Sequence, residues 1–304
     1  MSRSAAVLIA VSLLASACGS NPDRSVSDAV ANLTTTTGNS AADTPPETLP
    51  EIGENADHRS PWPRNPMTLS NVATWTIEVV SSTPHDSAAY TQGLEIADGI
   101  LYESTGLYGE STIRTVDPED GTTTASVDLD GSVFGEGLTV VGDELVQISW
   151  REQRAFRWDR HTLAPLGEWA YEGEGWGICL MGDRLVMSDG SDSLTWRDPA
   201  DFSTISTVAV RLGDQPIDYL NELECIGDTV IANIYTTTDL VVIDPTTGRI
   251  RAVIDASPLL DLVAGRIGTD SGNVLNGIAD LNDGTLLLSG KRWPEMFTVK
   301  VIES

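Results

Sequence analysis

The sequence of 304 residues is long enough for one large domain or two small ones, and 40% hydrophobic residues allow a substantial buried core. With 18 Lys and Arg against 45 Asp and Glu, the formal charge of −27 argues against a nucleic-acid partner and against electrostatic binding to anionic lipid. Three cysteines are too few for a disulfide-built scaffold, and three histidines without ligand-like spacing disfavour a histidine zinc site.

The N-terminal region has the pattern of an export signal. Arg3 precedes an apolar run from Ala5 to Leu14, which is too short for a permanent membrane span, and small residues precede Cys18. This pattern resembles a bacterial lipoprotein signal, so we expect residues 1–17 to be a cleaved signal peptide and Cys18 to carry the lipid. The alternative is ordinary secretion. In both cases we expect an exported protein, which reaches the outer face of the cell membrane only through a lipid on Cys18.

Residues 18–70 are interpreted as a disordered tether. This segment holds seven of the 15 prolines and a run of four threonines, and it has no sustained apolar periodicity. Such a composition cannot bury enough apolar surface to offset the entropy lost on ordering.

From residue 71 to residue 304 we predict an all-β domain with one helical segment near Ser257–Val263. Five similar units begin at positions 93, 137, 177, 222 and 277, each with a Gly-Asp or Asp-Gly turn between apolar strands. A period of roughly 40–50 residues is typical of a β-propeller with four strands per blade, which predicts five blades. Trp75–Val80 precedes the first unit, and we assign it as the strand that closes the last blade beside Met296–Ile302.

Two cysteines of this domain, Cys179 and Cys225, lie on neighbouring units at registers that differ by one residue. Because side chains alternate between the two faces of a strand, we expect these two to face opposite ways and not to form a disulfide.

The register of the units predicts a binding site at one end of a central channel. The residue before each unit start falls where the innermost strand enters the channel. These five residues are Gln92, Glu136, Trp176, Asn221 and Asn276. Each hairpin returns to the same end of the channel about thirteen residues after its unit start. These positions add Trp150, Tyr235 and Gly290, and Lys291 follows Gly290 there. Any one of these residues has a simpler explanation, because acids are often solvated in turns and tryptophans often pack between sheets. Together, however, aromatic rings, amides, an acid and an ammonium are typical of a small-molecule site.

Six motifs in chain order resemble a known enzyme family. They are Tyr90–Leu94, Phe134–Leu138, Glu174–Gly177, Leu220–Glu224, Val274–Ala279 and Gly290–Pro294. From Trp75 to Val301 the sequence resembles the plant and bacterial type of glutaminyl-peptide cyclotransferase, a five-bladed propeller. The resemblance implies conversion of N-terminal glutamine to pyroglutamate with release of ammonia, and hence peptide or protein N-termini bearing glutamine as partners.

The resemblance also implies roles for individual residues. Glu136 is the expected catalytic acid and base, and the expected substrate-binding groups are Gln92, Phe134, Trp150, Trp176, Asn221 and Lys291. Lys291 is also a catalytic candidate, because its ammonium, like the amides of Gln92 and Asn221, could stabilise a developing oxyanion. Tyr90 and Tyr235 stand where the family more often has Phe and Trp, and with Asn276 they complete the predicted substrate contacts.

The chemistry requires no cofactor, because the α-amine of glutamine can attack its own side-chain carbonyl and one carboxylate can move the proton. We interpret Asp128–Gly131 as a solvated turn, and a structural calcium ion bound there is the alternative. The sequence contains no Gly-x-Ser-x-Gly motif, which would have indicated a serine hydrolase. Two other functions stay open: a non-catalytic propeller that binds peptides or glycans, and a metal-dependent lactonase-like propeller.

Overall fold

The structure is a computed structural model that describes residues 72–303. The predicted signal peptide, the lipidation site Cys18 and the predicted tether lie outside the described residues. Within them the fold is all-β, and the one α-helix is the short α2 (Pro258–Val263), where the sequence predicts a helical segment. No helix in residues 72–303 is long and apolar enough to cross a membrane.

Three antiparallel sheets have four strands each, in chain order from the first strand to the fourth. The first comprises β2 (Thr91–Ala97), β3 (Ile100–Thr105), β4 (Thr112–Val116) and β5 (Thr123–Asp128). The second comprises β6 (Gly135–Val141), β7 (Glu144–Ser149), β8 (Arg154–Asp159) and β9 (Pro165–Ala170). The third comprises β10 (Ile178–Met181), β11 (Arg184–Ser188), β12 (Ser193–Arg197) and β13 (Thr204–Ala209). The Asp98-Gly99 turn, with both residues at positive φ, has the conformation that suits a tight hairpin.

The remaining strands form one ten-stranded sheet with β1 (Ala73–Pro84) in its middle. On one side of β1 lie β16 (Leu220–Ile226), β17 (Thr229–Ile234), β18 (Asp239–Asp244) and β19 (Arg249–Asp255), with the short β14 (Arg211–Leu212) and β15 (Gln215–Pro216) attached to β19. On the other side lie β20 (Leu275–Asp280), β21 (Leu286–Gly290) and β22 (Glu295–Ile302). The predicted pairing of β1 with β22 is confirmed and is antiparallel. The parallel pairing of Ala73–Thr76 with β19 is an addition that the sequence analysis did not foresee.

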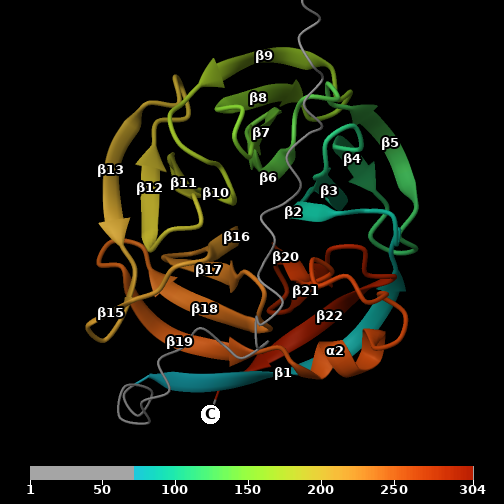
Figure 1. The fold of residues 1–304 in the computed structure, drawn as a ribbon, viewed down its shortest axis with the longest axis vertical. Helices are drawn as coiled ribbons and strands as arrows, with labels where there is room; N and C mark the ends of the chain where they lie inside the picture. The colour runs from blue at the N-terminus through green and yellow to red at the C-terminus, as the bar shows by residue number, and fades with distance from the viewer. Residues whose placement is uncertain (1–71, 304) are drawn as a thin grey trace, which may run out of the picture. The chain divides into compact units, whose positions relative to one another are not determined.

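Five strands, called the inner strands below, surround a common centre: β2, β6, β10, β16 and β20 (Figure 1). Each contacts the next, and β20 contacts β2, so the contacts close into a ring. Apolar side chains fill the spaces between successive sheets, as where Tyr102 and Ile113 pack against Leu138 and Leu145. The buried core therefore lies between sheets, and the inner strands bring their N-terminal ends together.

The structure contradicts the expectation about the cysteines, because Cys179 and Cys225 form a disulfide with their Cα atoms 5.5 Å apart. Their registers do differ by one residue, so they lie on opposite faces of their own sheets. The two sheets pack face to face, however, and Cys179 belongs to the same buried cluster as Leu223 and Ala232 of the next sheet. Opposite faces of successive sheets therefore point toward each other. The expectation that the two cysteines face away from each other is wrong for this reason.

We expect the Cys179–Cys225 disulfide to stabilise the domain by roughly 4 kcal/mol, since it closes a long loop in the unfolded chain. Reduction, or the double variant Cys179→Ala/Cys225→Ala, should lower Tm by about 10 °C in a calorimetric scan. Reductant should leave the Tm of the double variant unchanged. An unchanged Tm in reduced protein whose two thiols can be alkylated would show that the disulfide contributes nothing.

Candidate active site

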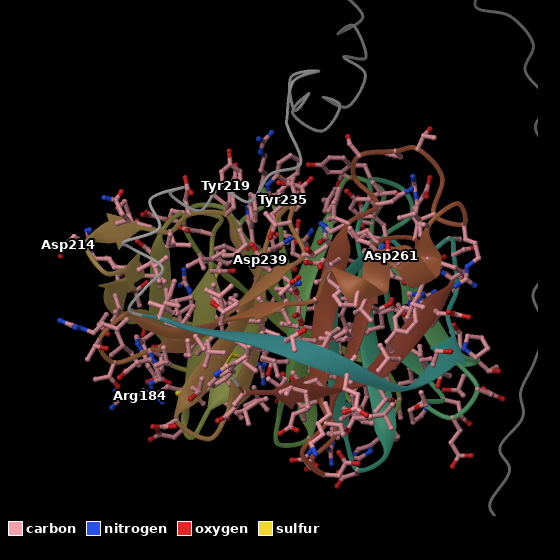
Figure 2. All side chains as sticks on the ribbon, turned by 90° about the horizontal axis from the view of Figure 1, so that it is seen from below. Arg184, Asp214, Tyr219, Tyr235, Asp239 and Asp261 are labelled. Carbon is pink, nitrogen blue, oxygen red and sulfur yellow. A yellow bond between two sulfur atoms is a disulfide. The ribbon has the colours of Figure 1, made fainter. Side chains whose placement is uncertain are left out.

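A cavity lies at the N-terminal ends of the inner strands, and nine of the ten residues predicted for the site line it. They are Tyr90, Gln92, Phe134, Glu136, Trp150, Trp176, Asn221, Tyr235 and Lys291. Figure 2 shows Tyr235 near one end of the domain and Arg184, beside a Gly-Asp turn, near the other. The cavity thus lies at the end of the domain opposite the tight turns that follow the inner strands.

A β-bulge occurs at the start of four inner strands, and each bulge holds one of the predicted site residues. The register shifts between residues 91 and 93, 135 and 138, 220 and 223, and 275 and 278. The residues at these shifts are Gln92, Glu136, Asn221 and Asn276. A bulge adds one residue to a strand and re-aims its side chain, which is why bulges recur beside active sites.

Glycine follows three of these four residues, since Glu222 follows Asn221, and at Gly93 and Gly137 the glycine has a packing reason. A Cβ on Gly137 would lie 2.8 Å from the Cα of Gly177, and a Cβ on Gly93 would lie 2.7 Å from the backbone N of Leu138. Neighbouring inner strands approach backbone to backbone at these positions, so only glycine fits. In each Gln-Gly or Glu-Gly pair, the first residue therefore points its side chain into the cavity, and the glycine allows the inner strands to pack closely.

Glu136 is 5% exposed and is held by a chain of amides. Gln92 Nε2 donates a hydrogen bond to Glu136 Oε1 at 3.2 Å. Asn276 Nδ2 donates to Gln92 Oε1 at 3.3 Å and to the Thr91 carbonyl at 2.9 Å. Asn276 was predicted to contact substrate, but the structure places it behind Gln92, where it orients that amide toward Glu136.

Burial shifts the protonation equilibria of both ionisable groups in the cavity. Burial raises the pKa of Glu136 well above its ordinary value; the Lys291 ammonium opposes this shift, and Glu152 and Glu174 add to it. Burial lowers the pKa of Lys291 to about 8, against the attraction of Glu136. Lys291 Nζ also lies 4.9 Å from the ring centroid of Tyr90 and 4.8 Å from that of Tyr235, which stabilises its charged form. The pKa of the acid is thus raised and that of the ammonium lowered, as is typical of groups that transfer protons in a reaction.

The sequence analysis missed three residues that support the cavity from outside: Tyr108, Glu152 and Glu174. Tyr108 packs edge-on against Phe134 with ring centroids 5.5 Å apart, and its hydroxyl donates to Glu152 at 2.9 Å. Glu174 accepts hydrogen bonds from both indole nitrogens of the site. In the sequence each acid stands two residues from a predicted tryptophan, and Glu174 begins one of the six motifs of the resemblance, but neither acid was assigned a role.

Part of the backbone beside the cavity has an unusual conformation. Four non-glycine residues beside it have positive φ: Leu107 (85°), Tyr219 (61°), Thr236 (71°) and Arg292 (59°). Thr236 and Arg292 directly follow the cavity residues Tyr235 and Lys291. Such conformations persist where the surroundings impose them, and they are common at ligand sites.

The turn Asp128–Gly131, where calcium is the alternative to a solvated turn, is closed by its own hydrogen bonds, because Asp130 Oδ1 accepts from the backbone N–H of Ser132. Within residues 72–303 no group of three or more His, Cys, Asp or Glu side chains is arranged to hold a metal ion.

Comparison with known proteins gives matches that span most of the chain. Residues 55–301 match the family model described as glutamine cyclotransferase. A glutaminyl-peptide cyclotransferase of Arabidopsis thaliana is 37% identical over 230 residues, which is 74% of this chain and 71% of the relative. The crystal structure of Myxococcus xanthus glutaminyl cyclase is similar with a TM-score of 0.73 and 36% identity, over 77% of this chain and 99% of that one.

Proposed function

The chain belongs to the glutamine cyclotransferase family, and we infer that its cavity converts N-terminal glutamine of peptides and proteins to pyroglutamate with release of ammonia. The observation that carries the assignment of the site is the buried Glu136, which faces an amide and an ammonium inside an aromatic cavity. This arrangement suits an intramolecular acyl transfer, because the nucleophile and the acyl group belong to the same substrate residue.

In the proposed mechanism, the neutral α-amine attacks the side-chain carbonyl carbon and closes a five-membered ring. The attacking nitrogen loses a proton to the Glu136 carboxylate, and the same carboxyl group then gives that proton to the amide nitrogen. The bond between that nitrogen and the former carbonyl carbon breaks, and ammonia leaves. No water is consumed. One positioned acid and base of this kind contributes about 10²–10⁴ in rate.

The remaining cavity residues have supporting roles in this proposal. The rings of Phe134, Trp150 and Trp176 hold the folded conformer of glutamine and exclude water, which makes ring closure more probable than in solution. The Lys291 ammonium and the side-chain amide of Asn221 are placed to stabilise the negative charge that develops on the carbonyl oxygen. Glu136 and Lys291 are therefore the proposed catalytic pair.

We also propose that the fold is a five-bladed propeller. In this interpretation the ten-stranded sheet is two blades joined by the parallel pair of β1 and β19, and β1 completes the blade of β20, β21 and β22. The ring of five inner strands and the five unit starts in the sequence support this count.

We propose that the protein is exported in a bacterium as a lipoprotein anchored through Cys18, with simple secretion as the alternative. The export pattern supports this localisation, and so does the disulfide, because disulfides persist in oxidising compartments. Incorporation of labelled palmitate that is lost in Cys18→Ser would support the anchor, and unlabelled wild-type protein would refute it.

The activity is tested by mixing purified protein with a peptide that begins with glutamine and measuring ammonia. An N-acetylated copy of the peptide is the control, since its nitrogen cannot attack. Release from the free peptide alone, unaffected by a chelator, supports the cyclotransferase without a metal cofactor. Loss of release on chelation would favour a metal-dependent enzyme, and no release at all would favour a binding protein.

A further inference from the structure

Four aromatic residues that line the cavity, together with Tyr108, which packs on one of them from outside, are called the aromatic wall here; the four are Phe134, Trp150, Trp176 and Tyr235. Phe134 contacts Tyr108 and Trp150 edge-on, each with ring centroids 5.5 Å apart. Trp176 contacts Tyr235 in the same way at 5.6 Å. The two halves of the wall meet between Trp150 and Trp176, where a carboxylate joins them.

That carboxylate is Glu174, in the loop between β9 and β10. Its Oε2 accepts the indole N–H of Trp150 at 2.8 Å and that of Trp176 at 3.1 Å. Its Oε1 accepts from Arg151 Nε at 3.0 Å, and the Arg151 guanidinium lies 3.8 Å from the ring centroid of Trp150. Hydrogen bonds to a charged acceptor are roughly twice as strong as neutral ones. One oxygen atom of Glu174 therefore fixes the orientation of both indoles.

The loop backbone is built to hold Glu174 in this place. Gly173 has a φ of 92°, which side chains disfavour. The backbone N–H of Gly175 donates to the Trp150 carbonyl at 2.9 Å, and a Cβ on Gly175 would lie 2.7 Å from the Ser149 carbonyl oxygen. Two glycines thus flank the acid and let its backbone lie against Ser149 and Trp150, at the end of β7.

We propose that Glu174 is a positioning residue of this site, which joins the two halves of the aromatic wall and holds a fixed negative charge on the two indoles that line the cavity with Glu136. The proposal rests on the proposed function, because it assigns Glu174 a part in the same reaction. Glu174 touches neither the reacting atoms nor the proton in transit. It acts through Trp150 and Trp176 on substrate binding, and through its charge on the proton affinity of Glu136.

The electrostatic part involves every charged or titratable group that faces Glu136. Lys291 favours the ionised carboxylate, whereas Glu152 and Glu174 favour the protonated acid. The phenols that interact with Glu136, all with raised pKa values and hence neutral, are Tyr90, Tyr108, Tyr171 and Tyr235. Partial burial opposes the ionisation of Glu174, but the bonds from Trp176, Trp150 and Arg151 lower its pKa overall. Glu174 therefore stays charged over the range in which Glu136 titrates.

Two variants separate the two parts of the role. Glu174→Gln keeps an oxygen that both indoles can bond to, so KM should stay within about twofold of wild type. Because the substitution removes a negative charge that favours the protonated Glu136, the acid limb of kcat/KM should move to lower pH by at least about 0.3 pH units. Glu174→Asp keeps the charge on a side chain one methylene shorter that cannot reach both indoles, so KM should rise about fivefold or more while the acid limb stays in place. The matched control is Glu172→Gln, an exposed acid of the same loop, which should resemble wild type in both respects.

A readout without turnover keeps this test separate from the test of the activity. The tryptophan fluorescence of the protein should change with pH as Glu136 ionises. The same titration of Glu136→Gln lacks this ionisation, so the difference between the two curves reports it. Its midpoint should move to lower pH in Glu174→Gln and not in Glu172→Gln. If wild type releases ammonia but both Glu174 variants keep the wild-type KM, acid limb and midpoint, the proposal about Glu174 is wrong and the activity stands. If wild type releases no ammonia, the activity is wrong, and an unmoved midpoint would still refute the electrostatic role.

Discussion

Glu136→Gln should lower kcat by at least about a hundredfold and change KM by less than about threefold. The substituted amide can still accept the hydrogen bond from Gln92 Nε2, so the cavity keeps its shape, but it cannot carry a proton between the two nitrogens of the substrate. Initial rates of ammonia release over a range of peptide concentrations give both constants. A raised KM with an intact kcat would instead make Glu136 a binding group for the substrate ammonium, and unchanged values of both constants would refute the site.

The same variant should alter stability in a pH-dependent way. Because burial raises the pKa of Glu136 in the folded state above its unfolded value, ionising this group costs stability as the pH rises from the unfolded value through the folded one. Glu136→Gln should therefore raise Tm more at pH 8 than at pH 5. Glu222→Gln is the matched control: Glu222 is also buried with a raised pKa on an inner strand, but it bonds to the backbone N–H of Leu94 and lies outside the cavity. It should show the same trend in Tm with an unchanged kcat.

The strands and their order could be predicted because their signals are local. From Ala73 to Val80 the burial of β1 alternates, with Trp75, Ile77 and Val79 turned inward, and a period of two can be recognised in a sequence. The parallel pairing of β1 with β19 and the disulfide could not be predicted in the same way. The strand pairing depends on which strand edges meet, and the disulfide depends on how two sheets face each other; the Cys179–Cys225 error shows that a correct register gives the wrong contact when that facing is not known.

The position of the cavity residues was predictable for a similar reason, since one register repeated along the chain places equivalent residues at one end of the inner strands. What each side chain contacts was not. Asn276 shares the register of Gln92, yet it lies behind Gln92 and bonds to it. Glu152 and Glu174 lie in the connections beside Trp150 and Trp176, outside the repeated register. Although Glu174 begins one of the six motifs, the supporting role of both acids is identified by the hydrogen bonds in the structure.

Deleting β1 should have the largest effect on stability. A chain that begins at Pro66 should keep kcat and Tm, because β1 begins at Ala73. A chain that begins at Ser81 loses Trp75, Ile77 and Val79, which pack into the cluster between β19 and β22. Burial of three such side chains contributes about 5–8 kcal/mol, comparable with the whole stability of a domain at roughly 5–15 kcal/mol. The shorter chain should therefore unfold or aggregate, because β19 and the C-terminal half of β22 lose the strand that pairs with them.

Two neighbouring substitutions test the same strand in a chain that still folds. Ile77 is 8% exposed and belongs to the buried cluster, whereas Glu78 faces solvent opposite Lys300. Ile77→Ala should lower the free energy of unfolding by about 2–4 kcal/mol, and Glu78→Ala should change it by less than about 0.5 kcal/mol. Urea titrations of both variants give these values. Equal effects of the two substitutions, or equal Tm values for the chains that begin at Pro66 and Ser81, would show that β1 does not close the domain.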